Sequence, residues 1–255
     1  DVFEQADKIL GFNLSEACFK GPAEALEATD IQQPAIFTAS VAVWRALESI
    51  APAHCRYDAM AGLSLGEYTA LHLAGAISFE DGLRLVRRRG QLIQEAAVAI
   101  PGGMVSIIGP DDAQVRAMCE QASSAGPIRP ANYNCPGQIV VSGAKAACDK
   151  IVELVEQQGG RAVLLKVAGA FHSPLMQSAA DGLRAALEAV AIQLPTVPVI
   201  ANVNVKPHGD PASIRDALVQ QLVQPVQWHA SIDSLVKDGF DQFVEIGPGR
   251  VLTGL

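Results

Sequence analysis

The stretch Gly62-Leu63-Ser64-Leu65-Gly66 decides the fold prediction, because it has the G-x-S-x-G pattern of a strand–turn–helix elbow. A short apolar run over 57–62 leads into it, and helix-forming residues follow over 65–75. Such an elbow lifts the serine hydroxyl clear of a sheet and aims it at the N-terminal end of a helix. We attribute both glycines to a turn too tight for side chains. The alternative is an ordinary small-residue turn, and the pattern alone leaves both interpretations open.

The bulk composition is that of a compact globular protein. The chain has 255 residues, of which 49% are hydrophobic and 18% charged, which fits one large domain or a domain with an insertion. The net charge of −8 disfavours nucleic acid and anionic membranes as partners. No apolar run reaches the roughly 18 residues of a membrane span. The five cysteines lack C-x-x-C spacing, which argues against a metal site and favours a reducing compartment.

Strand and helix patterns alternate along the chain. Helices are predicted at 34–49, 65–75, 80–98, 111–124, 144–158, 175–190, 211–222 and 229–237, and strands at 57–62, 104–108, 128–133, 138–142, 161–167, 197–201 and 242–246. The β-α-β-β-α-β order that starts near residue 100 is the ferredoxin-like pattern. We therefore predict an α/β fold in which a large domain with a mainly parallel sheet (1–99 and 169–255) carries an inserted small subdomain (100–168).

A serine nucleophile needs a base, and histidine suits neutral pH. His172 follows a predicted strand in a loop of small residues, at the strand end where ligands of parallel sheets gather. It is either a base opposite Ser64 or a cap of the next helix. We interpret the other four histidines as structural or solvated: His54, His72, His208 and His229.

One arginine of the predicted helix 80–98 falls on its apolar face rather than on its polar face. At about 100° per residue, Arg84, Arg87 and Arg88 share a polar arc, whereas Arg89 falls inside the apolar arc. A guanidinium is seldom buried without an anion. Arg89 therefore either forms a structural salt bridge or awaits a substrate carboxylate, which its planar fork binds through two hydrogen bonds.

The remaining polar signals are weaker. Asn132 and Asn134 flank a Pro-Gly turn with Gln138 and would line a cleft, although turns favour such residues anyway. Gln227 precedes a helix, where capping is the commoner role. The glycines of 247–249 lack the lysine and spacing of a phosphate-binding loop.

With Ser64, Arg89 and His172 in place, the chain closely resembles the malonyl-CoA:acyl carrier protein transacylases that load fatty-acid and polyketide synthases. The matching segments are Gln33-Pro34-Ala35, Gly62 to Leu71, Arg88-Arg89-Gly90, Gln94-Glu95-Ala96, Asn132 to Gln138, Gly169 to Met176, Pro225-Val226-Gln227-Trp228 and Glu245 to Gly254. The resemblance implies an α/β-hydrolase-like large domain with an inserted ferredoxin-like one. It also implies transfer of malonyl from malonyl-CoA to the phosphopantetheine thiol of acyl carrier protein through a malonyl-serine.

The resemblance assigns roles to individual residues. Ser64 is the nucleophile, His172 the general base, and Arg89 the residue that grips the malonyl carboxylate. The backbone N–H of Leu65 supplies half of the oxyanion hole. A backbone carbonyl near Gln227 orients the histidine, so that no acidic triad member is needed.

Two departures from the family pattern stand out. Leu63 replaces the usual histidine, which removes a polar contact near the substrate. The family's Gly-Gln-Gly-Ser-Gln segment, with the second oxyanion donor, lies upstream of Asp1, so we expect a longer protein to carry it. Phe171 beside His172 resembles the variants that prefer malonyl to its methylated relative, because the ring fills the space of an α-branch.

The resemblance implies malonyl-CoA and acyl carrier protein as partners, no cofactor and no metal. A monomer in the cytoplasm is expected, or in a plastid or mitochondrion for a eukaryotic protein. Two rival functions stay open at this point. One is a serine esterase or thioesterase with the same elbow, which an inward arginine disfavours for neutral acyl chains. The other is a non-catalytic module that only docks carrier proteins.

Overall fold

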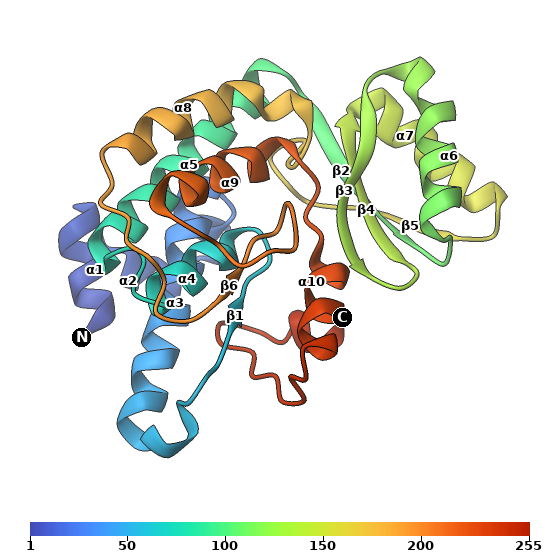
Figure 1. Cartoon of the computed structure of the whole chain (residues 1–255). Coiled ribbons are helices and arrows are strands. Elements are labelled where there is room, and N and C mark those ends of the chain that lie inside the picture. The colour runs from blue at the N-terminus through green and yellow to red at the C-terminus, as the bar shows by residue number, and fades with distance from the viewer.

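The computed structural model describes the backbone of residues 1–255 and every side chain except that of His54. A larger, mostly helical part and a smaller part with an antiparallel sheet lie side by side (Figure 1). The helices are α1 (Val2–Leu10), α2 (Leu14–Lys20), α3 (Thr29–Ile50), α4 (Leu65–Leu73), α5 (Phe79–Ala99), α6 (Asp112–Ala122), α7 (Lys145–Gln157), α8 (Gln177–Glu188), α9 (Pro211–Val223) and α10 (Trp228–Lys237). The strands are β1 (Met60–Ala61), β2 (Gly102–Ile108), β3 (Ile128–Cys135), β4 (Gln138–Ala144), β5 (Arg161–Leu164) and β6 (Val199–Ile200).

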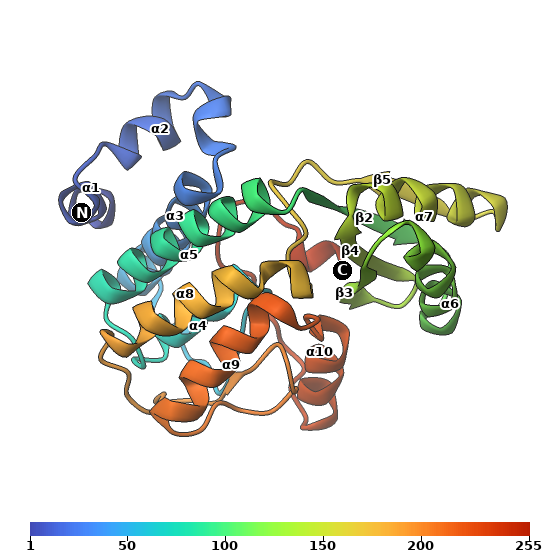
Figure 2. The ribbon, with the colours of Figure 1, turned by 90° about the horizontal axis from the view of Figure 1, so that it is seen from above.

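The larger part is built on a short parallel pair. Strand β1 pairs with β6 so that Met60 lies opposite Val199 and Ala61 opposite Ile200. Helices α3, α5, α8 and α9 pack against one another in succession, as the view from above shows (Figure 2). Their apolar faces and α4 form one continuous core. The elbow leaves β1 at the edge of this core and leads directly into α4.

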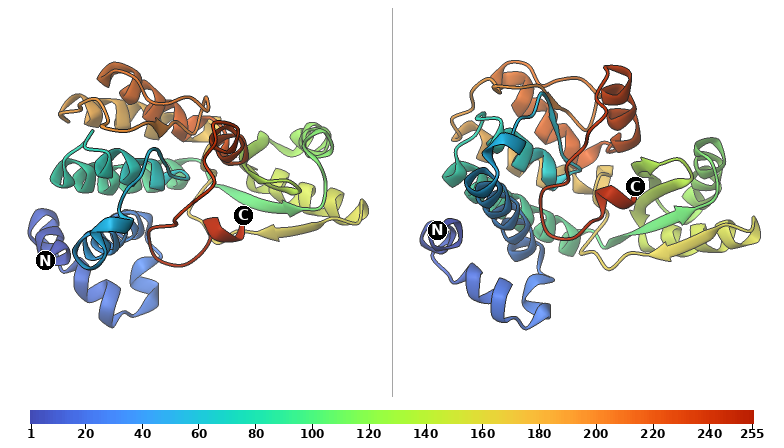
Figure 3. Two further views of the ribbon diagram at one scale, coloured as in Figure 1. Left: turned by 60° about the horizontal axis from the view of Figure 1, so that its bottom comes forward. Right: turned by 90° about the horizontal axis from the view of Figure 1, so that it is seen from below.

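The smaller part confirms the predicted β-α-β-β-α-β order. Its four strands lie in the order β3-β4-β2-β5, and each neighbouring pair is antiparallel. Helices α6 and α7 cover one face of this sheet with a separate apolar cluster that includes Val105, Ile107 and Ile151. The C-terminus lies between the two parts, whereas the N-terminus lies on the far side of the larger one (Figure 3).

Several predictions of the fold differ from the structure, among them the strands predicted at 57–62, 161–167 and 197–201, which are only Met60–Ala61, Arg161–Leu164 and Val199–Ile200. The parallel sheet has only two strands, so "mainly parallel" overstates its size. The predicted strand 242–246 is wrong: the segment has no ladder partner, and Phe243 is half-exposed. An apolar run shows that a segment suits a sheet, but not that a partner lies beside it. Helix α3 begins at Thr29 rather than Pro34, and its first turn packs so closely on α5 that a Cβ at Gly90 would overlap Thr29.

Among the described residues, no helix combines the length and the apolar character that crossing a membrane requires.

Candidate active site

Ser64 occupies the turn between β1 and α4 in a strained backbone conformation. Its φ of 52° and ψ of −102° lie where few residues other than glycine are found. Such a conformation costs about 1–3 kcal/mol and persists only where the surrounding contacts hold it. In the described part of the chain, the only other non-glycine residues with positive φ are His172 and Val205. The side chain of Ser64 is partly exposed, so a substrate can reach it.

The two glycines of the elbow differ in how much space surrounds them. A Cβ at Gly62 would overlap the carbonyl group of Gly66, so the turn has room only for glycine there. A Cβ at Gly66 would meet nothing within 4 Å. The prediction that tight space requires both glycines is therefore correct for Gly62 and wrong for Gly66.

This difference gives a matched pair of variants. We expect Gly62→Ala to lower the free energy of unfolding by at least about 3 kcal/mol, since the overlap is with backbone that cannot move aside. Gly66→Ala lies in the first turn of α4 and is expected to be neutral or stabilising by up to about 1 kcal/mol. Urea unfolding of both variants checks this. Equal stability of the two would show that close packing does not select Gly62.

His172 lies against Ser64 although the two are distant in sequence. Its Nε2 is 2.9 Å from Ser64 Oγ, and its Nδ1 is 2.6 Å from the backbone carbonyl oxygen of Gln221. A carbonyl can only accept, so Nδ1 carries the hydrogen and donates it to Gln221. Nε2 is then unprotonated and accepts the hydroxyl hydrogen of Ser64. This is the arrangement that a serine nucleophile and its general base require.

The surroundings keep this imidazole neutral. Burial, together with the nearby positive charge of Arg89, lowers the pKa of His172 to about 4, and the hydrogen bond to Gln221 opposes the shift. Near neutral pH the ring therefore has a free lone pair for the serine proton.

Arg89 points inward, as its helical position predicts, and is 3% exposed. Its Nη1 donates to Gln33 Oε1 at 2.7 Å, and its Nη2 donates to Gln221 Oε1 and Ser64 Oγ, both at 3.0 Å. Burial lowers the pKa of Arg89, and Tyr68 and Glu67 oppose this.

No carboxyl group in the described part of the chain forms an ion pair with this guanidinium. Its Nε is buried and has no hydrogen-bond partner among the described residues. The structural salt bridge that the sequence left open is therefore absent from that part of the chain. The buried cation is held by neutral amide oxygens and keeps donors for an incoming anion.

Gln221, which sequence reasoning missed, connects all of these residues. Its side-chain oxygen accepts from Arg89, its Nε2 donates to Glu67 Oε2 at 2.8 Å and to the Ser64 carbonyl at 2.9 Å, and its own carbonyl accepts from His172. The sequence did hold one signal for Gln221. On α9 it lies three residues after Leu218 and seven after Ile214, which are both buried, so Gln221 falls on the apolar arc of the helix.

Residues 3–254 match the acyl transferase domain family. The chain belongs to that family. The malonyl CoA-acyl carrier protein transacylase of Salmonella typhimurium is 44% identical over 259 residues, which cover 100% of this chain and 82% of that relative. The solved structure of the malonyl CoA-acyl carrier protein transacylase from Coxiella burnetii superposes with a TM-score of 0.95 at 40% identity, covering 100% of this chain and 80% of that one.

A second solved structure holds a type II polyketide synthase acyl-carrier protein in complex with its malonyl-transacylase. The matched chain of that structure superposes on this chain with a TM-score of 0.95 at 40% identity. The match covers 100% of this chain and 82% of the matched chain.

Gln227 occupies the N-cap position of α10, as its place before a helix predicts, although its side chain forms no capping bond. The carbonyl that orients His172 belongs to Gln221, on the preceding helix. The Gln227 backbone N–H instead donates to the carbonyl of Asn202 at 2.8 Å, and its carbonyl accepts from Ser231.

The other predicted substrate-binding residues lie around this centre. Leu65 is the first residue of α4, so its backbone N–H needs no partner within the helix. Phe171 is half-buried and packs against the large core and against a small cluster of Met104, Ala131 and Val140. Leu63 is half-exposed beside Ser64.

Asn132 and Asn134 lie on β3 in the smaller part. Asn132 is buried and forms a parallel bridge with Val226. The Nδ2 of Asn134 donates weakly to Gln138 at 3.4 Å, and its Oδ1 is buried without a partner among the described residues. Neither asparagine has a hydrogen bond to Ser64, His172 or Arg89 in the described structure.

The remaining histidines are placed apart from Ser64. His72 contacts the Ile77 carbonyl and packs between phenylalanines, and His229 is 3.3 Å from Asp233 on the surface of α10. His208 is buried against Glu67 rather than solvated. The His54 side chain lies outside the described part of the structure.

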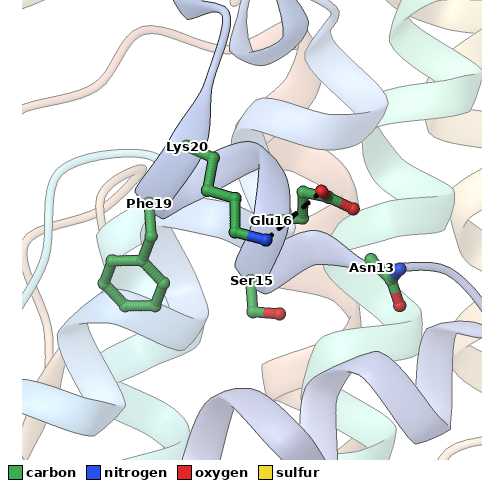
Figure 4. A pocket seen from close by; sticks show the side chains of 5 residues that line it. All are labelled: Asn13, Ser15, Glu16, Phe19 and Lys20. Carbon is green, nitrogen blue, oxygen red and sulfur yellow. Dashed lines mark ion pairs between the residues drawn. The ribbon is translucent and has the colours of Figure 1, made fainter.

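Two further features lie outside this centre. A surface hollow of about 330 Å³ on α2 is lined by Asn13, Ser15, Glu16, Phe19 and Lys20, and the Lys20–Glu16 ion pair spans 3.5 Å there (Figure 4). None of these side chains contacts the Ser64 centre. Among the described residues, no three His, Cys, Asp or Glu side chains cluster as metal ligands would.

Proposed function

We propose that this protein transfers the malonyl group of malonyl-CoA to the phosphopantetheine thiol of acyl carrier protein through a malonyl-Ser64 intermediate. One observation carries the proposal: Ser64 Oγ lies between the base nitrogen of His172 at 2.9 Å and the Nη2 of Arg89 at 3.0 Å. A nucleophile and a buried, carboxylate-free guanidinium in contact suit an acyl group that itself ends in a carboxylate.

In the first half-reaction, Ser64 Oγ attacks the thioester carbonyl carbon while its proton moves to His172 Nε2. The tetrahedral oxyanion is stabilised by the Leu65 N–H at the start of α4. When the carbon–sulfur bond breaks, the proton passes from His172 to the departing sulfur, and CoA leaves as the thiol.

In the second half-reaction, the phosphopantetheine thiol gives its proton to His172 Nε2 and attacks the ester carbonyl of malonyl-Ser64. The carbon–oxygen bond breaks, and Ser64 Oγ recovers the proton. Transfer rather than hydrolysis requires that water be kept from the ester, for which a closed cleft between the two parts of the molecule is suited.

Arg89 would hold the free malonyl carboxylate during both half-reactions. Gln33 and Gln221 fix its guanidinium from two sides with hydrogen bonds of 2.7 and 3.0 Å, so little side-chain entropy is lost when the substrate binds. Phe171 and Leu63 would border the acyl group, with Phe171 excluding an α-branch. Asn132 and Asn134 would line the approach from the smaller part.

We extend the proposal to the architecture and the partners. The larger part (1–99 and 169–255) would be an α/β-hydrolase-like domain, and residues 100–168 a ferredoxin-like subdomain, which the strand order β3-β4-β2-β5 supports. The complex of a type II polyketide synthase carrier protein with its malonyl-transacylase supports acyl carrier protein as the acceptor. Fatty-acid and polyketide synthesis are both compatible destinations for the product.

Mass spectrometry after brief exposure to malonyl-CoA tests the proposal. We expect the protein to gain the mass of one malonyl group at Ser64, to keep it without a carrier thiol, and to lose it when phosphopantetheinylated carrier protein is added. Ser64→Ala is expected to gain no mass. Rapid loss of the adduct to water alone would favour a thioesterase instead.

A further inference from the structure

Asn202 holds the elbow through two side-chain hydrogen bonds, although nothing in the sequence marked it as a site residue. It follows β6 and has no exposed surface. Its Oδ1 accepts from the Ser64 backbone N–H at 2.6 Å, and its Nδ2 donates to the Gly62 carbonyl at 2.8 Å. One side-chain amide thus spans the turn on both sides of Leu63.

This amide continues the strand pairing where the strands themselves stop. The parallel β1–β6 ladder ends at Ala61 and Ile200. Beyond it, the Gly62 carbonyl and the Ser64 N–H lack a ladder partner, and Asn202 supplies both an acceptor and a donor. The two bonds act on the residue whose φ is 52°, so they oppose relaxation of the strained turn.

Asn202 is itself fixed by a buried carboxyl group. Its backbone N–H donates to Glu67 Oε2 at 3.1 Å, and the other oxygen of Glu67 accepts from His208 Nε2 at 2.7 Å. The side chains of Glu67 and His208 are 0% and 1% exposed. The Asn202 carbonyl accepts from Gln227, so both ends of its backbone are held.

The same carboxyl group also reaches the base. Glu67 Oε2 accepts from Gln221 Nε2 at 2.8 Å, and the Gln221 carbonyl orients His172. Glu67 therefore anchors both the nucleophile, through Asn202, and the base, through Gln221. Because all these groups are buried, each lost bond would leave an unpaired polar atom, which strongly favours this one arrangement.

We propose that Asn202 is a positioning residue that holds the Ser64 hydroxyl in line with His172, with Glu67 as its anchor. This inference rests on the proposed role of Ser64 as a nucleophile. Asn202 forms no hydrogen bond with Arg89 among the described residues, and its contact with Gln221, which holds Arg89, is a weak one of 3.4 Å from Gln221 Nε2 to Asn202 Oδ1. Its loss therefore acts on the rate of attack far more than on the grip on malonyl. Substitution lowers the acylation rate constant for every acyl donor by a similar factor and leaves the apparent affinity for malonyl-CoA unchanged.

The test measures the rate constant for Ser64 modification by two reagents, malonyl-CoA and a small fluorophosphonate that reacts with activated serines. The variants are Asn202→Ala, which removes both bonds, and Asn202→Asp, which keeps the shape and the acceptor but loses the donor to Gly62. Asn204→Ala, an exposed change two residues away, is the matched control. Rate constants are compared rather than amplitudes, because misfolded molecules lower only the amplitude.

We expect about a hundredfold slower modification of Asn202→Ala by both reagents, the scale of an ångström of misplacement. Asn202→Asp is expected to be slowed at least tenfold, and Asn204→Ala not at all. Rate constants of either Asn202 variant equal to the wild type would overturn the proposal, and so would failure of both variants to fold. Wild-type protein that reacts with the fluorophosphonate but not with malonyl-CoA would refute the proposed function while leaving the Asn202 comparison valid.

Discussion

His172→Asn is expected to slow malonylation of Ser64 by about 10⁴-fold, the upper end of what removal of a general base costs. The imidazole Nε2, 2.9 Å from Ser64 Oγ, is the only base nitrogen that contacts the hydroxyl among the described residues. Asparagine is the suitable replacement because it tolerates the positive φ of 57° at this position better than most residues do. Single-turnover acylation followed by quenched-flow mass spectrometry gives the rate. His229→Ala, on the surface of α10, is the control and is expected to react normally.

The pH dependence of the same reaction follows from the burial of His172 and from the charge of Arg89 beside it. With a pKa of about 4, His172 in the free protein is a neutral base throughout the range above pH 5, so kcat/KM is expected to fall only below that range. Part of the lowering comes from Arg89. A bound malonyl carboxylate would offset that charge and raise the pKa of His172 in the complex. The fall in kcat is therefore expected at a higher pH than the fall in kcat/KM.

Residual activity close to the wild type in His172→Asn would contradict the role of His172. Coincident pH profiles of kcat and kcat/KM would leave His172 as the base but would argue that the malonyl carboxylate does not reach Arg89.

The sequence was sufficient for the parts of this site that have a local signature. Ser64 is marked by the G-x-S-x-G pattern, Arg89 by its place in the apolar arc of α5, and His172 by its loop after a strand. The structure brings these three side chains together. Helices α3 to α10 were predicted for the same reason: periodic apolar residues and caps, such as Ser78 before α5, are recognised from a few neighbouring positions.

The supporting residues were missed because their chemistry depends on contacts between distant segments. Asn202 follows a short strand in a turn-like stretch, where asparagine is ordinary. Its two bonds go to residues about 140 positions earlier. Glu67 follows the elbow on α4, where an acid in the first turn is expected from the helix dipole alone. Neither residue type nor spacing reveals that both are fully buried.

Gln221 shows how a local signal can be present and still be overlooked. The argument that placed Arg89 inward applies equally to Gln221 on α9, which lies beside buried Leu218 and Leu222. The failed strand at 242–246 shows the opposite case, in which a sound local pattern has no partner in the structure. Pairing is a tertiary property, so strands are less secure predictions than helices.

Arg89→Ala is expected to reduce kcat/KM for malonyl-CoA by about a thousandfold, because losing a buried, charge-assisted contact to the substrate carboxylate costs about 4 kcal/mol. The same change is expected to raise activity with acetyl-CoA, since a buried charge would no longer face a methyl group. The preference for malonyl over acetyl is thus expected to disappear or reverse. Competition between the two thioesters for Ser64, resolved by mass spectrometry of the adduct, measures the preference directly.

Arg88→Ala is the matched control for this prediction, since Arg88 is the preceding residue of α5, is exposed and pairs with Glu95 at 3.0 Å. It is expected to keep the malonyl preference. Arg89→Lys separates charge from shape: lysine keeps the charge but cannot donate in a planar fork to Gln33, Gln221 and a carboxylate together. It should therefore restore only part of the preference. An Arg89→Ala variant with unchanged selectivity would mean that this guanidinium only fills a buried gap among Gln33, Ser64 and Gln221.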